Sequence, residues 1–297
     1  MIINNRDNDE FLELARQDMI PLGLGINNNL DNNLRFKKSS FNIILGHANV
    51  GKTYFVLWYQ LALSHLHGLK HLIYSAENSV NSLKRNLIEL YINKKIKFMS
   101  EEELQQGKTF IEFHFVFIDM QCLWTIDEFM KGVQKMGKFD SLMIDPINSF
   151  TRPRGMNAHE ADYETASKLR LFAKKTGTSV YVCMHANTEA LRKVHPAKHV
   201  YEGLPQRPNG SDAEGGGKWI NRCDDFITIH RYTQSPLDWM YTDVHILKVK
   251  ETESGGRPTF LNEPVRFKLY QGTSFLCGGV NSLDIEKSSI LAPNTDF

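Results

Sequence analysis

The sequence predicts an α/β fold, with a mostly parallel central sheet, helices on both of its faces and antiparallel strands at the C-terminal end. Apolar runs of strand length alternate with helical segments between residues 41 and 185, as in sheets whose parallel strands are joined by helices. Three further strand-like runs, at 226–230, 244–250 and 265–270, follow without long helices between them. The length of 297 residues suits one large domain of this class.

A glycine-containing segment between the first strand and the first helix predicts a phosphate site. It reads G-x-x-x-x-G-K-T, the form of a phosphate-binding loop when a strand precedes it and a helix follows. The segment and the next residue are Gly46, His47, Ala48, Asn49, Val50, Gly51, Lys52, Thr53 and Tyr54. We expect backbone N–H groups and the helix N-terminus to bind phosphates, Lys52 to reach the β- and γ-phosphates, and Thr53 to hold Mg²⁺. The sequence therefore predicts an ATP site; a chance match in a loop is the alternative.

The N-terminal half is divided by glycines, prolines and changes of periodicity. Residues 9–18 predict a short helix, which must pack either on its own domain or on a neighbouring subunit. Residues 22–33 predict a polar turn region. The segments that follow are a strand at 41–45, a helix at 54–66 ended by Gly68, a strand at 69–76, a helix at 79–91, a surface helix and loop at 92–109, and a strand at 110–119 with Phe113, Phe115 and Phe117 on one face.

The second half continues the alternation and then changes character. It predicts a helix at 125–136, a strand at 139–144, a helix at 158–175 and a strand at 178–184. Residues 186–217 are rich in glycine and proline and predict a long, mobile, functional loop. A short helix at 218–223 precedes the last three strands, with a hairpin turn at Gly255 and Gly256. We expect three parts: a helix segment at 1–22, the main domain at 23–280 and a frayed tail at 281–297.

Three polar residues each follow a predicted strand, at the edge where the phosphate loop also lies. Asp145 is positioned to hold Mg²⁺, and Glu77 to act as the general base for an attacking water. His185 is positioned to donate a hydrogen bond to the γ-phosphate. Each has a structural alternative: helix capping for the two acids and a structural role for the histidine. Ligands bind at the carboxyl ends of parallel strands, so the coincidence predicts a hydrolytic site.

Bulk composition narrows the function classes. The net charge of +1 predicts no global attraction to nucleic acid, so any basic surface must be local. Four cysteines lie far apart without a C-x-x-C pair, which favours reduced thiols over a disulfide frame or a zinc site. No apolar run approaches the length of a membrane span, and residues 1–7 do not read as a signal peptide. We therefore expect a cytoplasmic protein with no membrane partner.

Several motifs in order give the chain a family resemblance. They are the G-x-x-x-x-G-K-T loop, Ser75-Ala76-Glu77, Asp145-Pro146-Ile147, Met184-His185-Ala186-Asn187, the segment from Gly210-Ser211-Asp212 to Arg231, and Lys248-Val249-Lys250-Glu251 with Gly255-Gly256. Over about residues 20–275 the chain resembles the RecA-like motor domain of ring-shaped replicative helicases, the DnaB and phage primase-helicase type of superfamily 4, in a short stand-alone version.

The resemblance implies a hexameric ring with ATP and Mg²⁺ between subunits. Glu77 would be the catalytic glutamate and His185 the γ-phosphate sensor. Lys248 and Lys250 would supply the finger, a cation that reaches into the ATP site of a neighbouring subunit, with Arg257 as a substitute. Arg231 and Tyr270 would pack the adenine. The N-terminal helix would be a linker that docks on the next subunit. The residues that would face single-stranded DNA in the channel are Arg152, Arg154, Arg192, Lys193, Lys198, Arg207 and Lys218.

Three functions compete on these grounds. One is an ATP-driven helicase and translocase on single-stranded DNA, encoded by a bacterium, phage or plasmid, with priming or loading supplied by a separate primase or loader. Another is a RecA-like ATPase that assembles on DNA or protein without unwinding, such as a recombination mediator or a signalling ATPase. A small-molecule kinase is disfavoured because no arginine-rich lid is visible. Polarity, ring size and NTP preference are left open.

Overall fold

A single sheet organises the molecule. The structure is a computed structural model that describes residues 9–17, 19–120, 122–152 and 155–284. Its described strands form one sheet in the order β3-β2-β4-β5-β1-β6-β7-β8-β9. Neighbouring strands from β3 to β6 are parallel, and those from β6 to β9 are antiparallel. The predicted fold class is therefore confirmed. The strands are β1 (Phe41–Gly46), β2 (His71–Ser75), β3 (Phe115–Ile118), β4 (Ser141–Asp145), β5 (Ser179–His185), β6 (Asp225–His230), β7 (Tyr241–Lys248), β8 (Val265–Tyr270) and β9 (Ser274–Cys277).

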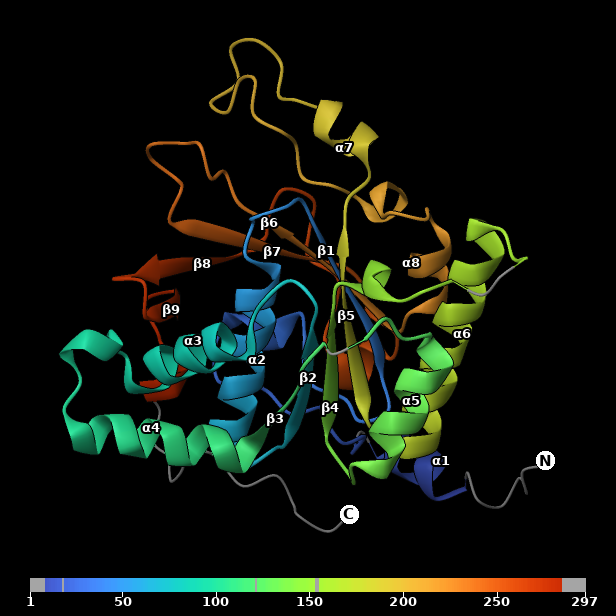
Figure 1. The fold of residues 1–297 in the computed structure, drawn as a ribbon. Helices are drawn as coiled ribbons and strands as arrows, with labels where there is room; N and C mark the ends of the chain where they lie inside the picture. The colour runs from blue at the N-terminus through green and yellow to red at the C-terminus, as the bar shows by residue number, and fades with distance from the viewer. Residues whose placement is uncertain (1–8, 18, 121, 153–154, 285–297) are drawn as a thin grey trace.

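Helices cover both faces of the sheet (Figure 1). One face carries α2 (Lys52–His67), α3 (Val80–Ile92) and α4 (Glu101–His114), and the other carries α5 (Ile126–Lys135), α6 (Ala158–Thr176) and α8 (Lys218–Arg222). Side chains alternate along each strand, so that Ile44 joins the core under α2 whereas Ile43 and Leu45 join the core under α6. The shorter helices are α1 (Asp9–Arg16), α7 (Thr188–Arg192) and α9 (Thr252–Gly255).

The helix that leaves the phosphate loop is also the anchor of the antiparallel strands. It ends at Gly68, which adopts a left-handed φ of 72°. Trp58 of α2 packs edge-on against Phe267 and Phe275, with ring centroids 5.0 and 5.2 Å away. Because Phe275 belongs to β9, which the sequence did not predict, a long-range aromatic contact decides where that strand lies.

The expected strand at residues 110–119 is wrong in its first half. Helix α4 begins at a capping box formed by Ser100 and Glu103 and continues to His114, so only 115–118 remain for β3. Phe110 stacks on Tyr91 of α3 at 4.0 Å, while Phe113 is 64% exposed. The common face expected for the alternating phenylalanines does not form, because tertiary contact with α3 favours helix over strand.

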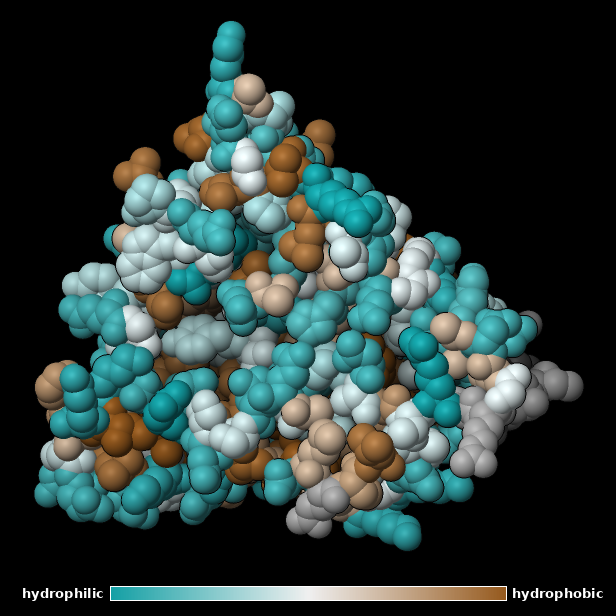
Figure 2. Space-filling view, turned by 45° about the horizontal axis from the view of Figure 1, so that its top comes forward, coloured by the Kyte–Doolittle hydropathy of each residue, from teal (hydrophilic) through white to brown (hydrophobic). Residues whose placement is uncertain are grey.

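Two segments expected as loops contain more structure than predicted. In residues 22–33, Ile26 and Leu30 are fully buried, and the Asp31 carboxylate accepts hydrogen bonds from the backbone N–H groups of Ile26 and Asn27. Residues 186–217 hold α7 and three isolated bridges, and Tyr201 stacks on Tyr232 at 3.6 Å. This segment projects at the top of Figure 1, and Figure 2 shows apolar side chains on that part of the surface.

The turn at Gly255 and Gly256 and the start of the tail also need correction. Strands β7 and β8 are antiparallel as expected, but α9 lies between them, and the two glycines pack against Lys37 and Asn33 and do not form a tight hairpin. Residues 281–284 are not frayed, because Ser282 and Leu283 are buried. The rest of the expected tail, 285–297, lies outside the described residues. Within the described part of the chain, no helix is long and apolar enough to cross a membrane.

A candidate nucleotide site at the carboxyl edge of the sheet

The phosphate loop has one position with no room for a side chain and two positions with left-handed backbone. A Cβ on Gly46 would lie 2.6 Å from the carbonyl oxygen of Ile229 and 2.8 Å from Val50 Cγ2, so this position excludes a side chain. Asn49 and Gly51 have φ values of 61° and 93°. Helix α2 begins directly afterwards at Lys52, which leaves its unpaired N–H groups at the loop. These features favour anion binding there.

Lys52 lies inside this loop and lacks a strong acceptor. It is 6% exposed, and its Nζ donates to the carbonyl oxygens of His47 at 2.8 Å and Gly46 at 3.2 Å. Burial lowers the pKa of Lys52, and the nearby acids Asp145 and Glu77 oppose that shift only in part. A phosphate would be a better partner than two carbonyl groups.

Asp145 and Thr53 form a pair of oxygen donors beside the lysine. The Thr53 hydroxyl donates to the Asp145 carboxylate at 2.7 Å, and the Ser75 hydroxyl lies 3.4 Å from the same oxygen. Asp145 is 1% exposed, and burial raises its pKa despite the hydrogen bond from Thr53. A Mg²⁺ ion prefers carboxylate and hydroxyl oxygens, so this donor set fits the metal. The Cys183 thiol, which the sequence did not single out, also contacts Asp145.

Glu77 and His185 are in direct contact above the loop. The Glu77 carboxylate lies 2.9 Å from His185 Nε2, and His185 Nδ1 lies 3.4 Å from Lys52 Nζ. Parallel pairing explains this convergence, because β1 and β5 end in register with Gly46 opposite His185. Glu77 follows β2, which pairs with the Asp145 strand. The structure thus places all three strand-end residues together with the phosphate loop, as expected.

The adenine candidates lie at the same edge but are not equivalent. The Arg231 side chain, just after β6, donates through Nε to the carbonyl oxygen of Trp239, and its guanidinium lies 5.9 Å from the Trp239 ring. Burial lowers the pKa of Arg231. Tyr270, at the end of β8, is half exposed. Arg231 is therefore already engaged within the chain, and Trp239 is a neighbour that the sequence did not indicate.

The finger candidates lie at the opposite edge. Strand β7 runs antiparallel to β6, and Lys248 pairs with Phe226 at the start of β6, far along the strand from the phosphate loop. Lys248 Nζ donates at 2.7 Å to the carbonyl oxygens of Ile220 and Cys223 at the end of α8. The Lys250 side chain is half exposed, and its Nζ lies 3.6 Å from Asp224. The exposed Arg257 lies 5.2 Å from the Phe260 ring.

Several of the basic residues expected to face DNA already have acidic partners. Ion pairs join Arg152 to Asp162 at 3.6 Å, Arg192 to Glu189 at 2.7 Å, and Lys193 to Asp212 at 2.5 Å. Lys198 is exposed, and Arg154 lies outside the described residues.

Two of the expected DNA contacts point into the protein. The Lys218 side chain is only 7% exposed, with its Nζ bonded to the carbonyl oxygen of His159 and 3.6 Å from Asp162. Arg207 is partly buried, and burial lowers its pKa. The structure therefore does not support Lys218 as a surface contact. The resemblance placed Lys218 in the DNA channel, whereas the short helix predicted at 218–223 forms as α8 and packs against α6.

The fold and the site together define a RecA-like phosphate-loop NTPase. The order of the strands, the glycine loop before α2 and the acids at neighbouring strand ends are the features that carry this assignment. Among such proteins, the chain has the fold of the ATPase domains of DnaB-like helicases, as comparison with solved structures shows.

Two of these solved structures align over nearly the whole chain. One, an isolated ATPase domain of the DnaB-like class, has a TM-score of 0.73 at 15% identity and covers 91% of this chain and 98% of that one. The other, a DnaB-like replicative helicase described with its interactions with primase, has a TM-score of 0.72 at 14% identity and covers 93% and 67%. A KaiC-like protein from Pyrococcus horikoshii is more distant, with a TM-score of 0.53 at 14% identity, covering 84% and 94%.

In sequence, the chain is 26% identical over 247 residues to the Twinkle homolog protein, chloroplastic/mitochondrial, of Arabidopsis thaliana. That match covers 76% of this chain and 33% of the relative, so the chain spans about a third of the length of this curated protein. No family model matches the sequence.

Proposed function

We propose that this chain is an ATP-hydrolysing motor that moves on single-stranded DNA as a ring-shaped helicase or translocase. The observation that carries the proposal is the continuous set of contacts from Lys52 through His185 to Glu77, beside the Thr53–Asp145 pair. Such a set brings a cation that would bind phosphate, a γ-phosphate sensor and a general base together at the carboxyl edge of the sheet. The DnaB-like neighbours in fold and the Twinkle homolog in sequence support the same class.

The residues of the loop fit a nucleoside triphosphate and Mg²⁺. Lys52 and the N-terminus of α2 would bind the phosphates, and Thr53 and Asp145 would hold the metal, whose positive charge would offset charge that develops on the phosphate oxygens. Binding would also give the buried Lys52 and Asp145 charges the partners that they lack in the isolated chain.

Glu77 is placed to act on water. Its carboxylate is half exposed and oriented by His185 at 2.9 Å, so it would accept a proton from a water whose oxygen attacks the γ-phosphorus as the bond to the bridging oxygen breaks. His185 joins that carboxylate to Lys52. A change at the γ-phosphate would therefore alter the position of the general base.

We propose that the motor works as a homo-oligomer, as a hexameric ring. Lys248 and Lys250 lie too far from the chain's own phosphate loop to serve it, so they or Arg257 would serve a neighbour. Helix α1 has Leu12 exposed and lies on the side of α5 and α6 in Figure 1, opposite α4.

An apolar groove on the other side offers α1 of a second copy a place to dock. It is lined by Tyr91, Phe110 and Phe113, and Figure 2 shows apolar side chains over α3 and α4 at its lower left. Docking of α1 in this groove would be head-to-tail, the arrangement that closes into rings.

The proposed partner is single-stranded DNA, in the cytoplasm of a bacterial cell and within phage or plasmid replication. A separate primase or loader completes the proposed set of partners. The residues proposed to contact the DNA strand are Arg152, Arg192, Lys193 and Lys198, because each is exposed on the segments that follow β4 and β5. Their binding would depend on salt, because it releases counterions from phosphates.

One observation favours a second candidate, a RecA-like ATPase that assembles without unwinding. Most of the expected DNA-facing cations already have acidic partners, so the chain offers fewer free charges than its sequence suggests. A recombination mediator or signalling ATPase would need fewer contacts with a translocating strand.

Strand displacement separates the two candidates. Purified chain with Mg²⁺ and ATP is mixed with a forked duplex that carries a fluorophore and quencher, and Glu77→Gln serves as the matched control. We expect ATP-dependent displacement by the unchanged chain alone, and rings in electron micrographs with single-stranded DNA and a non-hydrolysable ATP analogue. A chain that stays monomeric under those conditions, or rings that hydrolyse ATP without displacing a strand, would favour the second candidate.

A further inference from the structure

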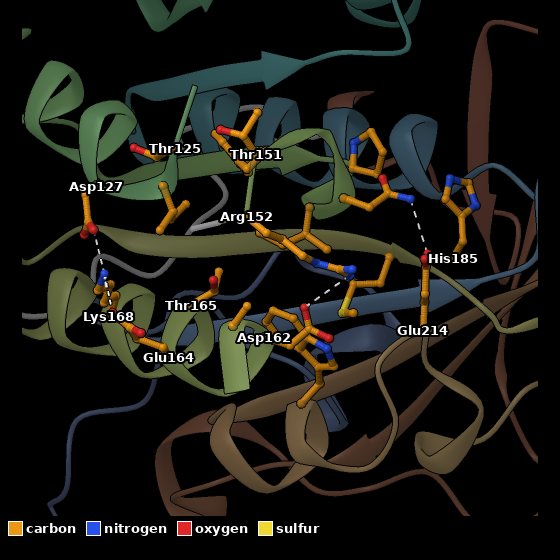
Figure 3. Close-up of a pocket in the computed structure, with 18 residues that line it drawn as sticks. Thr125, Asp127, Thr151, Arg152, Asp162, Glu164, Thr165, Lys168, His185 and Glu214 are labelled. Atoms are coloured by element: carbon orange, nitrogen blue, oxygen red, sulfur yellow. Dashed lines mark hydrogen bonds and ion pairs between the residues drawn. The ribbon is translucent and has the colours of Figure 1, made fainter. Parts of the chain in front are cut away.

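A cavity of about 500 Å³ lies beside the nucleotide site, on the α5 and α6 side of the sheet (Figure 3). Its walls come from the start of α5, the segment after β4, α6, the end of β5 and the segment that runs from Glu214 to Trp219. Arg152 lies on the second of these walls and Thr165 on the third. The volume falls within the range of small-molecule pockets. The phosphate loop does not line it, so this cavity adjoins the proposed ATP site without containing its phosphate loop.

The charges of the cavity exclude a phosphate. Its lining has four carboxylates, from Asp127, Asp162, Glu164 and Glu214, against the two permanent cations Arg152 and Lys168. Both cations are already committed, because Lys168 lies 2.6 Å from both Asp127 and Glu164 and Arg152 lies 3.6 Å from Asp162. An anion would meet a net negative surface, so the occupant is neutral or cationic and donates hydrogen bonds.

The walls combine aromatic side chains with a buried unpaired donor. Phe150 and Trp219 line the cavity together with aliphatic side chains. Trp219 is 1% exposed, and its indole N–H has no acceptor among the described residues. A buried donor without a partner is costly, so an occupant that brought an acceptor to this N–H would be favoured. A ring that stacks on aromatic side chains and both donates and accepts hydrogen bonds fits such walls.

His185 belongs to both the cavity and the nucleotide site. Its ring lines one end of the cavity (Figure 3), and its two nitrogens lie 2.9 Å from Glu77 and 3.4 Å from Lys52. An occupant that moved His185 would therefore move the partner of the proposed general base.

We propose that this cavity receives one unpaired base of the bound DNA strand, and that His185 reports its presence to Glu77. This inference rests on the proposed function. The phosphates of the strand stay outside with the exposed cations, while the neutral base enters the cavity that Phe150 and Trp219 help to line. Amino groups on the base donate to the carboxylates, and a ring nitrogen or carbonyl oxygen accepts from the Trp219 indole.

The first test compares an intact single-stranded oligonucleotide with an abasic oligomer of the same length and phosphate count. Affinity is measured by fluorescence anisotropy, and ATP turnover is measured with saturating amounts of each oligomer. We expect the abasic oligomer to bind roughly tenfold more weakly or worse, and to stimulate turnover less even when saturating. Equal affinity and equal stimulation would overturn the inference while leaving the proposed function intact. If neither oligomer bound, the proposed action on DNA would itself fail, and this inference with it.

The second test fills the cavity from α6. Thr165→Trp places a large ring in it, and Leu171→Trp adds the same ring at an exposed position of the same helix. We expect Thr165→Trp to lose most of the difference between intact and abasic oligomers, and Leu171→Trp to keep it. A Thr165→Trp protein with a normal thermal transition that still discriminates as the unchanged chain does would show that bases are recognised elsewhere. If that variant does not fold, Thr165→Leu is measured in the same way, since it fills less of the space.

Discussion

Two charged regions of this molecule differ in how their charges are neutralised. At the nucleotide edge, Lys52 and Asp145 are buried. Burial lowers the pKa of Lys52 and raises the pKa of Asp145, which favours the neutral form of each. Lys52 has no ion pair among the described residues. In the segments after β4 and β5, by contrast, Arg152, Arg192 and Lys193 are each paired with an acid of the same chain.

The difference shows where a ligand is required. Buried charges without partners oppose folding, so a chain that keeps them gains when phosphate or metal supplies the missing charge. Paired surface charges contribute little and must exchange one partner for another before they bind a phosphate. We therefore expect substitutions at the nucleotide edge to have large effects and those in the basic segments to have small ones.

Replacing the central cation should have the largest effect. Lys52→Ala removes the buried ammonium that would contact the β- and γ-phosphates, so we expect weak nucleotide binding and a loss of turnover of about 10²–10³-fold or more. Fluorescent nucleotide titration and a phosphate-release assay measure the two effects. Lys38→Ala, at an exposed lysine just before β1, should behave like the unchanged chain. Normal turnover in Lys52→Ala would contradict the phosphate-loop assignment.

Removing the general base should separate binding from turnover. Glu77→Gln keeps the size of the side chain and a partner for His185 but cannot accept the proton, so we expect ATP binding to persist while turnover falls by roughly 10²–10⁴-fold. The same two assays apply, with the exposed Glu112→Gln as the control. If Glu77→Gln hydrolysed ATP at the normal rate, another residue would have to be the base.

The cost of burying Asp145 should appear in stability without ligand. Its pKa is raised on folding, so the folded chain holds the proton more tightly than the unfolded chain. Ionisation therefore opposes folding at neutral pH, and this cost is lost as pH falls through the raised pKa toward the unfolded value near ~3.9. The free energy of unfolding of Asp145→Asn should thus exceed that of the unchanged chain by about 1–3 kcal/mol at pH 7. The difference should be smaller near pH 4.

Urea denaturation without nucleotide or Mg²⁺ measures that difference at each pH. The exposed Asp119→Asn should change the unfolding free energy little at either pH. A variant Asp145→Asn that was less stable than the unchanged chain at pH 7 would mean that the hydrogen bond from Thr53 outweighs the cost of burial.

The smallest effect is expected in the basic segment after β5. Arg192→Ala with Lys193→Ala removes two cations that Glu189 and Asp212 already neutralise in part. We expect DNA affinity to fall by only a few-fold at low salt, and the slope of log affinity against log salt to decrease by about one or two. Lys174→Ala with Lys175→Ala, exposed at the far end of α6, is the matched control. An unchanged slope would place the strand elsewhere.

Local patterns determined much of this protein. The glycine loop needs only neighbouring residues to curl around a phosphate, and the alternation of apolar strands and helices needs only side-chain periodicity. Because parallel strands end at a common edge, the positions of Glu77, Asp145 and His185 in the sequence were enough to predict that they meet.

Only the tertiary structure decided which charges are free and which space is empty. Lys218 and Lys248 look like exposed cations in the sequence, yet packing of α8 supplies their acceptors from distant segments. Phe113 belongs to an alternating pattern that is typical of a strand, yet it lies in α4, whose Phe110 packs on Tyr91 of α3. The cavity beside His185 exists because several segments that are distant in the chain leave space between them. Ion pairing, burial and voids depend on contacts between residues far apart in the chain, which no local pattern encodes.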